Sequence, residues 1–106
     1  MTFNDIFKRL AAPIVQAPMA GSQNHRLALA VCQSGGLGSL PAAMWTAQDL
    51  QQELNALTQA TKAPYNVNFF CHASPEIDGS KHMQWLKALA PYYQELGLKQ
   101  DLAVAG

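Results

Sequence analysis

Apolar residues along the chain fall into short continuous runs that alternate with helical patterns. Three runs of β-branched, aromatic or small apolar residues predict strands at residues 13–19 (PIVQAPM), 37–43 (LGSLPAA) and 65–71 (YNVNFFC). After each run, apolar residues spaced three and four apart predict a helix, beginning near Asn24, near Thr46 and near Ser80. Strands alternating with helices are typical of a parallel α/β architecture.

Residues with capping chemistry stand at the ends of the predicted helices. Asn24 is a good N-cap for the first helix, and Gly35 stands where its C-terminal cap would lie. Thr46 followed by Asp49 resembles a capping box with Asp in place of Glu. The last helix contains Pro91, which is expected to bend or restart it, because proline clashes with the carbonyl four residues earlier.

The length of the chain restricts the architectures open to these three βα units. They suit part of an open doubly wound sheet or a segment of a (β/α)8 barrel. The chain has 106 residues, whereas eight such units typically need about 250 residues. The chain is therefore too short to close a barrel by itself.

Composition indicates a globular chain and excludes several classes of partner. Hydrophobic residues make up 49% and charged residues 13%, with seven basic and seven acidic side chains. The sequence has no cluster of Lys or Arg that could bind nucleic acid or an anionic membrane. No run approaches the roughly 18 apolar residues of a membrane span, and residues 1–10 lack the apolar core of a signal peptide. We expect a cytoplasmic protein, and the low charge suggests that apolar surface is covered by something else.

Two segments containing glycine are candidate ligand loops. Residues 16–21 (QAPMAG) end the first predicted strand, where α/β folds bind ligands and where small residues let a flat ligand approach the backbone. A tight turn of small residues is the alternative. Residues 34–39 (SGGLGS) follow a helix and precede a strand, and Pro41 stands where a dinucleotide-binding loop has its third glycine. Helix capping and close packing are therefore favoured there over phosphate binding.

Amide side chains are the other candidate chemistry. Asn66 and Asn68 share one face of the third predicted strand, because they are two residues apart. Such an amide can donate to a carbonyl and accept from an N–H of a heterocycle, unless neighbouring backbone satisfies it. His25, His72 and His82 lack the spacing of a helical metal site. No metal site and no catalytic residue is assigned.

Taken together, the segments PIVQAPMAG, SGGLGSL and YNVNFF resemble the N-terminal portion of the bacterial nitronate monooxygenases, formerly called 2-nitropropane dioxygenases. These are FMN-dependent (β/α)8 barrel enzymes. The resemblance extends from about Pro13 to Gly97. It implies that residues 1–106 form a partial TIM-barrel domain, the N-terminal three βα units of a barrel that is incomplete in this chain.

The resemblance also implies which residues bind the cofactor. FMN would lie at the C-terminal mouth of the barrel, with the backbone of Ala17, Pro18 and Met19 against the isoalloxazine ring and Asn68 hydrogen-bonding it. Ser22 stands where many relatives have a second glycine. The family's phosphate-binding loops and its substrate-linked histidine come from later βα units, so we expect the chain to lack them.

The implied reaction is the oxidative denitrification of alkyl nitronates to carbonyl compounds and nitrite, with electron transfer to FMN and consumption of O2. We expect the chain to be inactive alone and to self-associate through exposed sheet edges. One alternative is a related FMN-dependent barrel oxidoreductase of the enoyl-acyl carrier protein reductase type. Another is a non-catalytic α/β protein that forms oligomers.

Overall fold

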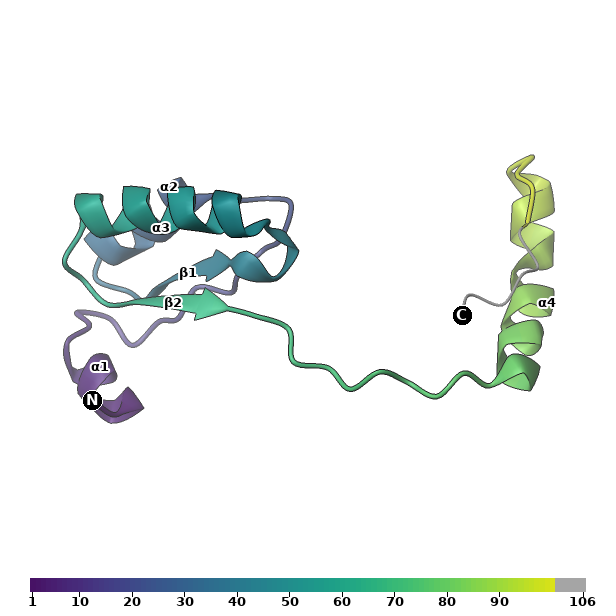
Figure 1. Ribbon diagram of the computed structural model, residues 1–106, viewed down its shortest axis with the longest axis horizontal. Helices are drawn as coiled ribbons and strands as arrows, with labels where there is room; N and C mark the ends of the chain where they lie inside the picture. Colours follow the sequence, from purple (N-terminus) through teal and green to yellow (C-terminus); the bar gives the residue numbers. More distant parts are fainter. Residues whose placement is uncertain (101–106) are drawn as a thin grey trace. The chain divides into compact units, whose positions relative to one another are not determined.

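The structure, a computed structural model, describes residues 1–100 and divides into two compact units that meet at residues 71 and 72. The last six residues of the predicted domain lie outside the described residues. The first unit contains α1 (Phe3–Lys8), α2 (His25–Gln33), β1 (Gly38–Pro41), the 3₁₀ helix η1 (Ala42–Met44), α3 (Ala47–Ala60) and β2 (Tyr65–Asn68), and the second contains α4 (Gly79–Glu95) (Figure 1).

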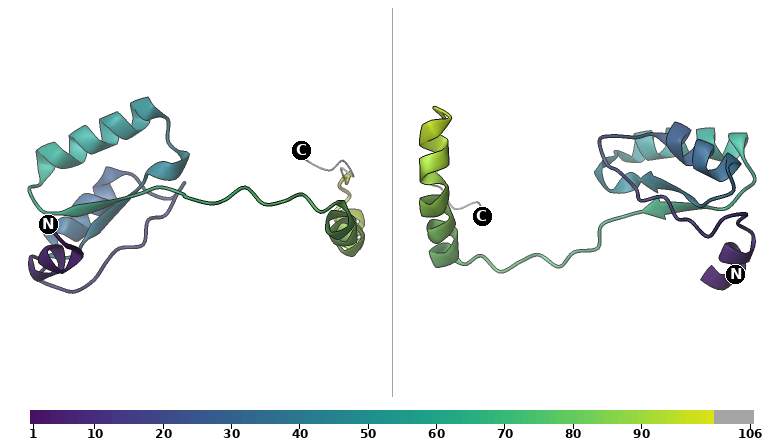
Figure 2. Two further views of the ribbon diagram at one scale, coloured as in Figure 1. Left: turned by 60° about the horizontal axis from the view of Figure 1, so that its bottom comes forward. Right: turned by 180° about the vertical axis from the view of Figure 1, so that it is seen from behind.

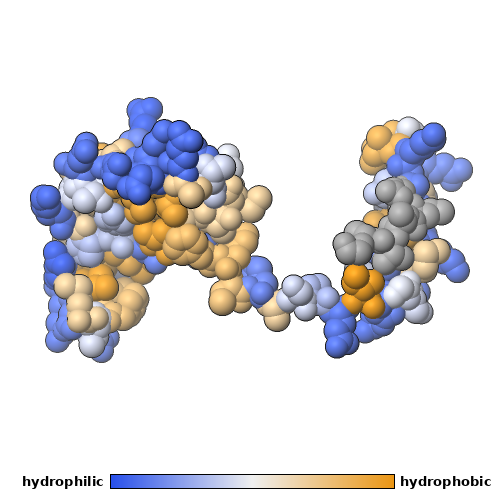
Figure 3. Space-filling model, viewed as in Figure 1, coloured by the Kyte–Doolittle hydropathy of each residue, from blue (hydrophilic) through white to orange (hydrophobic). Residues whose placement is uncertain are grey.

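The first unit is built on two parallel strands with α2 and α3 on one side of them (Figures 1 and 2). The core lies between these layers, where Ala28 of α2, Leu40 of β1 and Leu57 of α3 are fully buried. Trp45 and Tyr65 pack against this cluster. Hydrophilic side chains cover the outer side of α3 in Figure 3, as the 3.6-residue periodicity requires. The predicted parallel α/β architecture is confirmed for this unit.

The first predicted strand, residues 13–19, does not form a strand. It makes a single parallel bridge, Val15 to Leu37, in which Leu37 N donates to Ile14 O and Gln16 N donates to Leu37 O, both at 2.9 Å. The next donor on this segment would be Pro18, which has no N–H, so the ladder cannot continue. The prediction of three strands was therefore wrong for this segment, and two strands form within residues 1–100.

The other two predicted strands form but are shorter than expected. β1 ends at Pro41 and the chain turns at once into η1, whereas the prediction extended to residue 43. β2 ends at Asn68, the residue paired with Pro41, instead of residue 71. A strand needs a hydrogen-bonding neighbour, and β1 offers β2 none beyond Pro41.

The predicted helix starts are confirmed by their caps. Asn24 Oδ1 accepts from Arg26 N at 2.9 Å, and Thr46 Oγ1 accepts from Asp49 N at 3.1 Å. Gly35 follows α2 with φ of +94°, a conformation that suits glycine after a helix end. The structure also has α1, which the sequence analysis did not predict.

In the second unit, α4 begins after Asp78, whose carboxylate accepts from Lys81 N at 3.1 Å. The helix continues through Pro91, so the expected restart does not occur. Proline removes only one backbone donor, and the turns on both sides keep their own hydrogen bonds. Within residues 1–100, no helix has the length and apolar character needed to cross a membrane.

Candidate functional site at the carboxyl ends of the strands

The two faces of the sheet differ in chemistry. Leu40 and Val67 are paired and point toward the helices, because Leu40 lies in the core with α2 and α3. Their neighbours Ser39 and Asn66 are also paired and point to the opposite face, where Asn66 Nδ2 donates to Ser39 Oγ at 3.2 Å. The predicted polar face of the third strand is confirmed, and a buried serine on β1 extends it.

The segment predicted to contact the cofactor leaves the sheet directly after its single bridge. Ala17 and Met19 are exposed and Pro18 is half-buried, with 44% of Met19 accessible. Ser22 N donates to Met19 O at 3.1 Å, so the chain turns back immediately. Gly21 in this turn has φ of +78°, and no other atom lies within 4 Å of where a Cβ would stand. The arrangement leaves a small, rigid backbone loop at the carboxyl end of the strands.

Two glutamine side chains replace the backbone pairing that Pro18 prevents. Ser39 N donates to Gln16 Oε1 and Ser39 O accepts from Gln23 Nε2, both at 2.9 Å. Gln16 Nε2 donates to Gln23 Oε1 at 2.6 Å, and the same oxygen accepts from Met19 N at 2.9 Å. The fully buried Ser39 therefore has both backbone groups satisfied by side-chain amides.

Gln23 was missed by the sequence analysis. It stands in the loop between a predicted strand and a predicted helix, where glutamine has no marked preference. Its two main partners, Met19 and Ser39, lie 4 and 16 residues away. A proline late in a predicted strand has no N–H, so a buried carbonyl on the neighbouring strand is left without its backbone donor. A nearby amide side chain that could donate instead is the signal in the sequence that would have pointed to Gln23.

Asn68 lies at the same end of the sheet as this loop but does not contact it. It is the last residue of β2, is half-buried, and pairs with Pro41. β1 separates it from the segment that bridges at Val15, so two strand spacings of about 4.8 Å each lie between them. Among the described residues, none forms a hydrogen bond with the Asn68 side chain. The structure thus brings the predicted cofactor residues to the carboxyl end of the sheet, on either side of β1.

The glycines of residues 34–39 allow neighbouring segments to pack closely around the start of β1. A Cβ at Gly38 would collide with the carbonyl group of Ala28 and lie 2.9 Å from Cys32 Sγ. A Cβ at Gly35 would lie 2.6 Å from Cβ of Ala11. The prediction that this segment caps a helix and packs closely is confirmed.

A hydrogen-bonded pair that the sequence did not reveal, His25 and Glu53, joins α2 to α3. Glu53 Oε2 accepts from the backbone N of His25 at 2.6 Å and lies 2.8 Å from His25 Nδ1. The two residues are 28 positions apart, so no local pattern indicates the pair. The carboxylate adds a second cap to the start of α2, beside Asn24.

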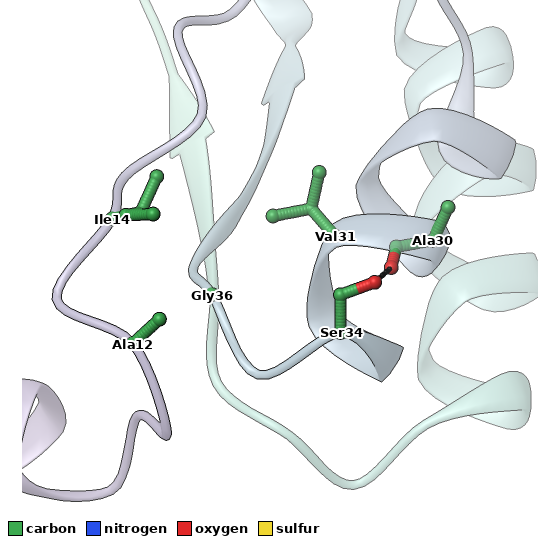
Figure 4. A pocket seen from close by; sticks show the side chains of 6 residues that line it. All are labelled: Ala12, Ile14, Ala30, Val31, Ser34 and Gly36. Carbon is green, nitrogen blue, oxygen red and sulfur yellow. Dashed lines mark hydrogen bonds between the residues drawn. The ribbon is translucent and has the colours of Figure 1, made fainter.

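Two hollows flank the first unit. One, of about 570 Å³, adjoins the loop at the carboxyl end and is lined by Gly21, Ser22, Gln23, Asn24, Arg26 and Leu27. The other, of about 260 Å³, is mainly apolar and is lined by Ala12, Ile14, Ala30, Val31, Ser34 and Gly36 (Figure 4). The second lies where the chain enters β1, at the amino end of the sheet. Ligands of α/β folds bind at the carboxyl ends, so only the first adjoins the candidate site.

Within residues 1–100, no three His, Cys, Asp or Glu side chains gather where one ion could bind them.

Comparison with known proteins identifies the family. A sequence profile of nitronate monooxygenases matches residues 4–104. This chain belongs to the nitronate monooxygenase family. The resemblance drawn from the three segments above is therefore confirmed, and the family is one of oxidoreductases.

Individual members of the nitronate monooxygenase family match most of this chain. The chain is 41% identical over 85 residues to a nitronate monooxygenase of Paraburkholderia phytofirmans, covering 80% of this chain and 23% of that protein. It is 38% identical over 96 residues to one of Pseudomonas aeruginosa, covering 88% and 27%. The structure is similar to nitroalkane oxidase from Streptomyces ansochromogenes, with a TM-score of 0.66 and 35% identity, covering 90% of this chain and 27% of that one. The chain thus spans about a quarter of the length of these relatives.

Proposed function

We propose that this chain supplies the N-terminal βα units of an FMN-dependent (β/α)8 nitronate monooxygenase and forms part of its flavin site. The supporting observation is that Ala17–Met19 and Asn68, the residues assigned to FMN from the resemblance, lie at the carboxyl end of the same parallel sheet. The overall reaction is the conversion of an alkyl nitronate and O2 to a carbonyl compound and nitrite. The chain is proposed to be cytoplasmic and inactive without the rest of the barrel.

The residues at the carboxyl end of the sheet suit an isoalloxazine ring. The loop offers small side chains and a backbone whose direction Pro18 restricts, so a flat ring can lie close to it. Asn68 carries a donor and an acceptor on one amide, which matches a ring edge with alternating N–H and carbonyl groups. Its amide is not engaged by the described residues. The donor set therefore fits the ring part of FMN.

Each proposed residue has a distinct task in the reaction. When bound, FMN would accept electrons from the nitronate and pass them to O2. Asn68 orients the ring by hydrogen bonding, and the backbone of Ala17 and Pro18 supports it. The side chain of Met19, which is exposed, would cover the ring and exclude water. None of these residues is proposed as an acid or base.

Self-association is proposed through the edge of the sheet. In the described part of the chain, β2 pairs only with β1, which leaves one edge of β2 with unpaired backbone groups. Phe69 and Phe70 follow that edge and are 59% and 58% exposed. An open edge beside apolar surface favours pairing with a second chain.

A chimera tests the proposed activity. Residues 13–97 of this chain would replace the matching segment of the Paraburkholderia phytofirmans enzyme, and nitrite release from an alkyl nitronate would be measured. We expect the chimera to keep its FMN and its nitrite release. The Asn68→Ala chimera should bind FMN more weakly, by about three- to tenfold, whereas a Gln52→Ala control on the exposed side of α3 should not. Oxidation of NAD(P)H with an enoyl thioester, without nitrite release, would favour the reductase alternative.

A further inference from the structure

Two side chains hold the loop that carries Ala17–Met19. Gln16 Nε2 donates to Ala17 O at 3.0 Å, and the second side chain is that of Gln23. Its Oε1 accepts from Met19 N at 2.9 Å, and its Nε2 donates to Ser39 O at 2.9 Å. The first bond fixes the loop, and the second fixes Gln23 to the buried strand β1. Gln23 therefore connects the exposed loop to the core through one rigid amide group.

The surrounding contacts determine which way this amide points. Oε1 faces two donors, Met19 N and Gln16 Nε2, whereas Nε2 faces two acceptors, Ser39 O and Asn24 O at 3.3 Å. A flipped amide would place donor against donor and acceptor against acceptor. All four contacts consequently favour the same orientation.

The network also explains why the loop stands free of the sheet. Any residue other than proline at position 18 could donate its backbone N–H to Ser39 O and continue the ladder. Because Pro18 cannot, Gln23 Nε2 occupies that acceptor, and Gln16 Oε1 takes the Ser39 N–H at 2.9 Å. Because side chains satisfy both backbone groups of Ser39, the backbone of residues 17–19 does not pair with β1 there.

We propose that Gln23 is a positioning residue for the flavin-contacting loop, acting through Met19 N. The proposal rests on the proposed function for its ligand, but the positioning itself is a property of the chain without flavin. Gln16 supports Gln23 from the other side by donating to its Oε1 at 2.6 Å.

Two substitutions at position 23 separate positioning from general stability. Gln23→Glu keeps an acceptor for Met19 N and loses the donor to Ser39 O, whereas Gln23→Met loses both. Both variants should unfold at lower urea concentration, because Ser39 O is left unsatisfied. Only Gln23→Met should release the loop, because the carboxylate in Gln23→Glu can still accept from both Met19 N and Gln16 Nε2. A purely structural role would give the two variants the same loop behaviour.

The readout is the water exchange rate of the Met19 amide in the full chain, measured by NMR, together with lumiflavin binding. Exchange should be about three- to tenfold faster in Gln23→Met and unchanged or slower in Gln23→Glu. Lumiflavin affinity should follow the same order, and Gln52→Ala serves as the control. Equal Met19 exchange in wild type and Gln23→Met would overturn the positioning role. Failure of the wild-type chain to bind lumiflavin, with the Met19 effect intact, would instead count against the proposed flavin site.

Discussion

Gly38 lets α2 approach β1 closely, since any Cβ there would meet the Ala28 carbonyl group. Gly38→Ala should lower the free energy of unfolding of the first unit by about 1–3 kcal/mol, because backbone must move. Trp45 packs against the core of that unit, so its fluorescence in a Trp85→Phe background can follow urea unfolding. Gly79→Ala is the matched control, because nothing lies within 4 Å of a Cβ at Gly79. Equal midpoints for both variants would show that the close packing is absent.

Asp5 shows how the first helix depends on pH. The Thr2 backbone N–H and then the Thr2 hydroxyl donate to its carboxylate, both at 2.8 Å, and these bonds lower the pKa of Asp5 below its ordinary value. A lowered pKa in the folded state means that the cap stabilises α1 above the ordinary carboxyl pKa. This contribution is lost as pH falls through the lowered value.

The side-chain carboxyl chemical shift of Asp5, followed by NMR against pH, checks this direction. Thr2→Ala removes the hydroxyl donor and should move the Asp5 midpoint upward, toward that of an unstructured peptide. An Asp5 midpoint that is ordinary in the wild type would contradict the capping geometry.

At the scale of elements, α3 depends on its N-cap. Thr46 Oγ1 accepts from Asp49 N at 3.1 Å and donates to the Asp49 carboxylate at 2.8 Å. Thr46→Ala should cost about 0.5–2 kcal/mol of stability in urea unfolding, whereas Thr46→Ser keeps the hydroxyl and should cost much less. If both substitutions behave alike, the hydroxyl does not stabilise the helix start.

Local chemistry explains which elements could be predicted from the sequence. Asn24, Thr46 and Gly35 act through neighbours within a few residues, so their helices were located closely. The same Thr-x-x-Asp pattern occurs at Thr2 and Asp5, where it begins α1, and it was overlooked there.

The remaining differences arise from pairing over long sequence distances. The apolar pattern of residues 13–19 is that of a strand, but the absent N–H of Pro18 limits its pairing to one bridge. Gln23 completes the contact from another part of the loop. Likewise, His25 and Glu53 are paired only because α2 and α3 fold side by side. The location of Ala17–Met19 and Asn68 at the carboxyl end of the sheet could be predicted from the order of the strands. The side-chain amides that hold the loop could not.

At the scale of the whole molecule, the low proportion of charged residues corresponds to apolar surface that the described residues leave exposed. Ile14 is 62% exposed in the first unit and Trp85 68% exposed in the second. Such surface favours burial against further structure. This agrees with the proposal that the chain contributes βα units to a larger barrel.

The proposed flavin site makes the most direct prediction at this scale. We expect lumiflavin, added to the ¹⁵N-labelled chain, to shift the NMR signals of Ala17, Met19 and the Asn68 side-chain amide while leaving Gln52 unchanged. Asn68→Ala should weaken binding by about three- to tenfold, the loss of one hydrogen bond. Shifts confined to the apolar hollow of Ala12–Gly36, or no shifts at millimolar lumiflavin, would contradict a flavin site at the carboxyl ends of the strands.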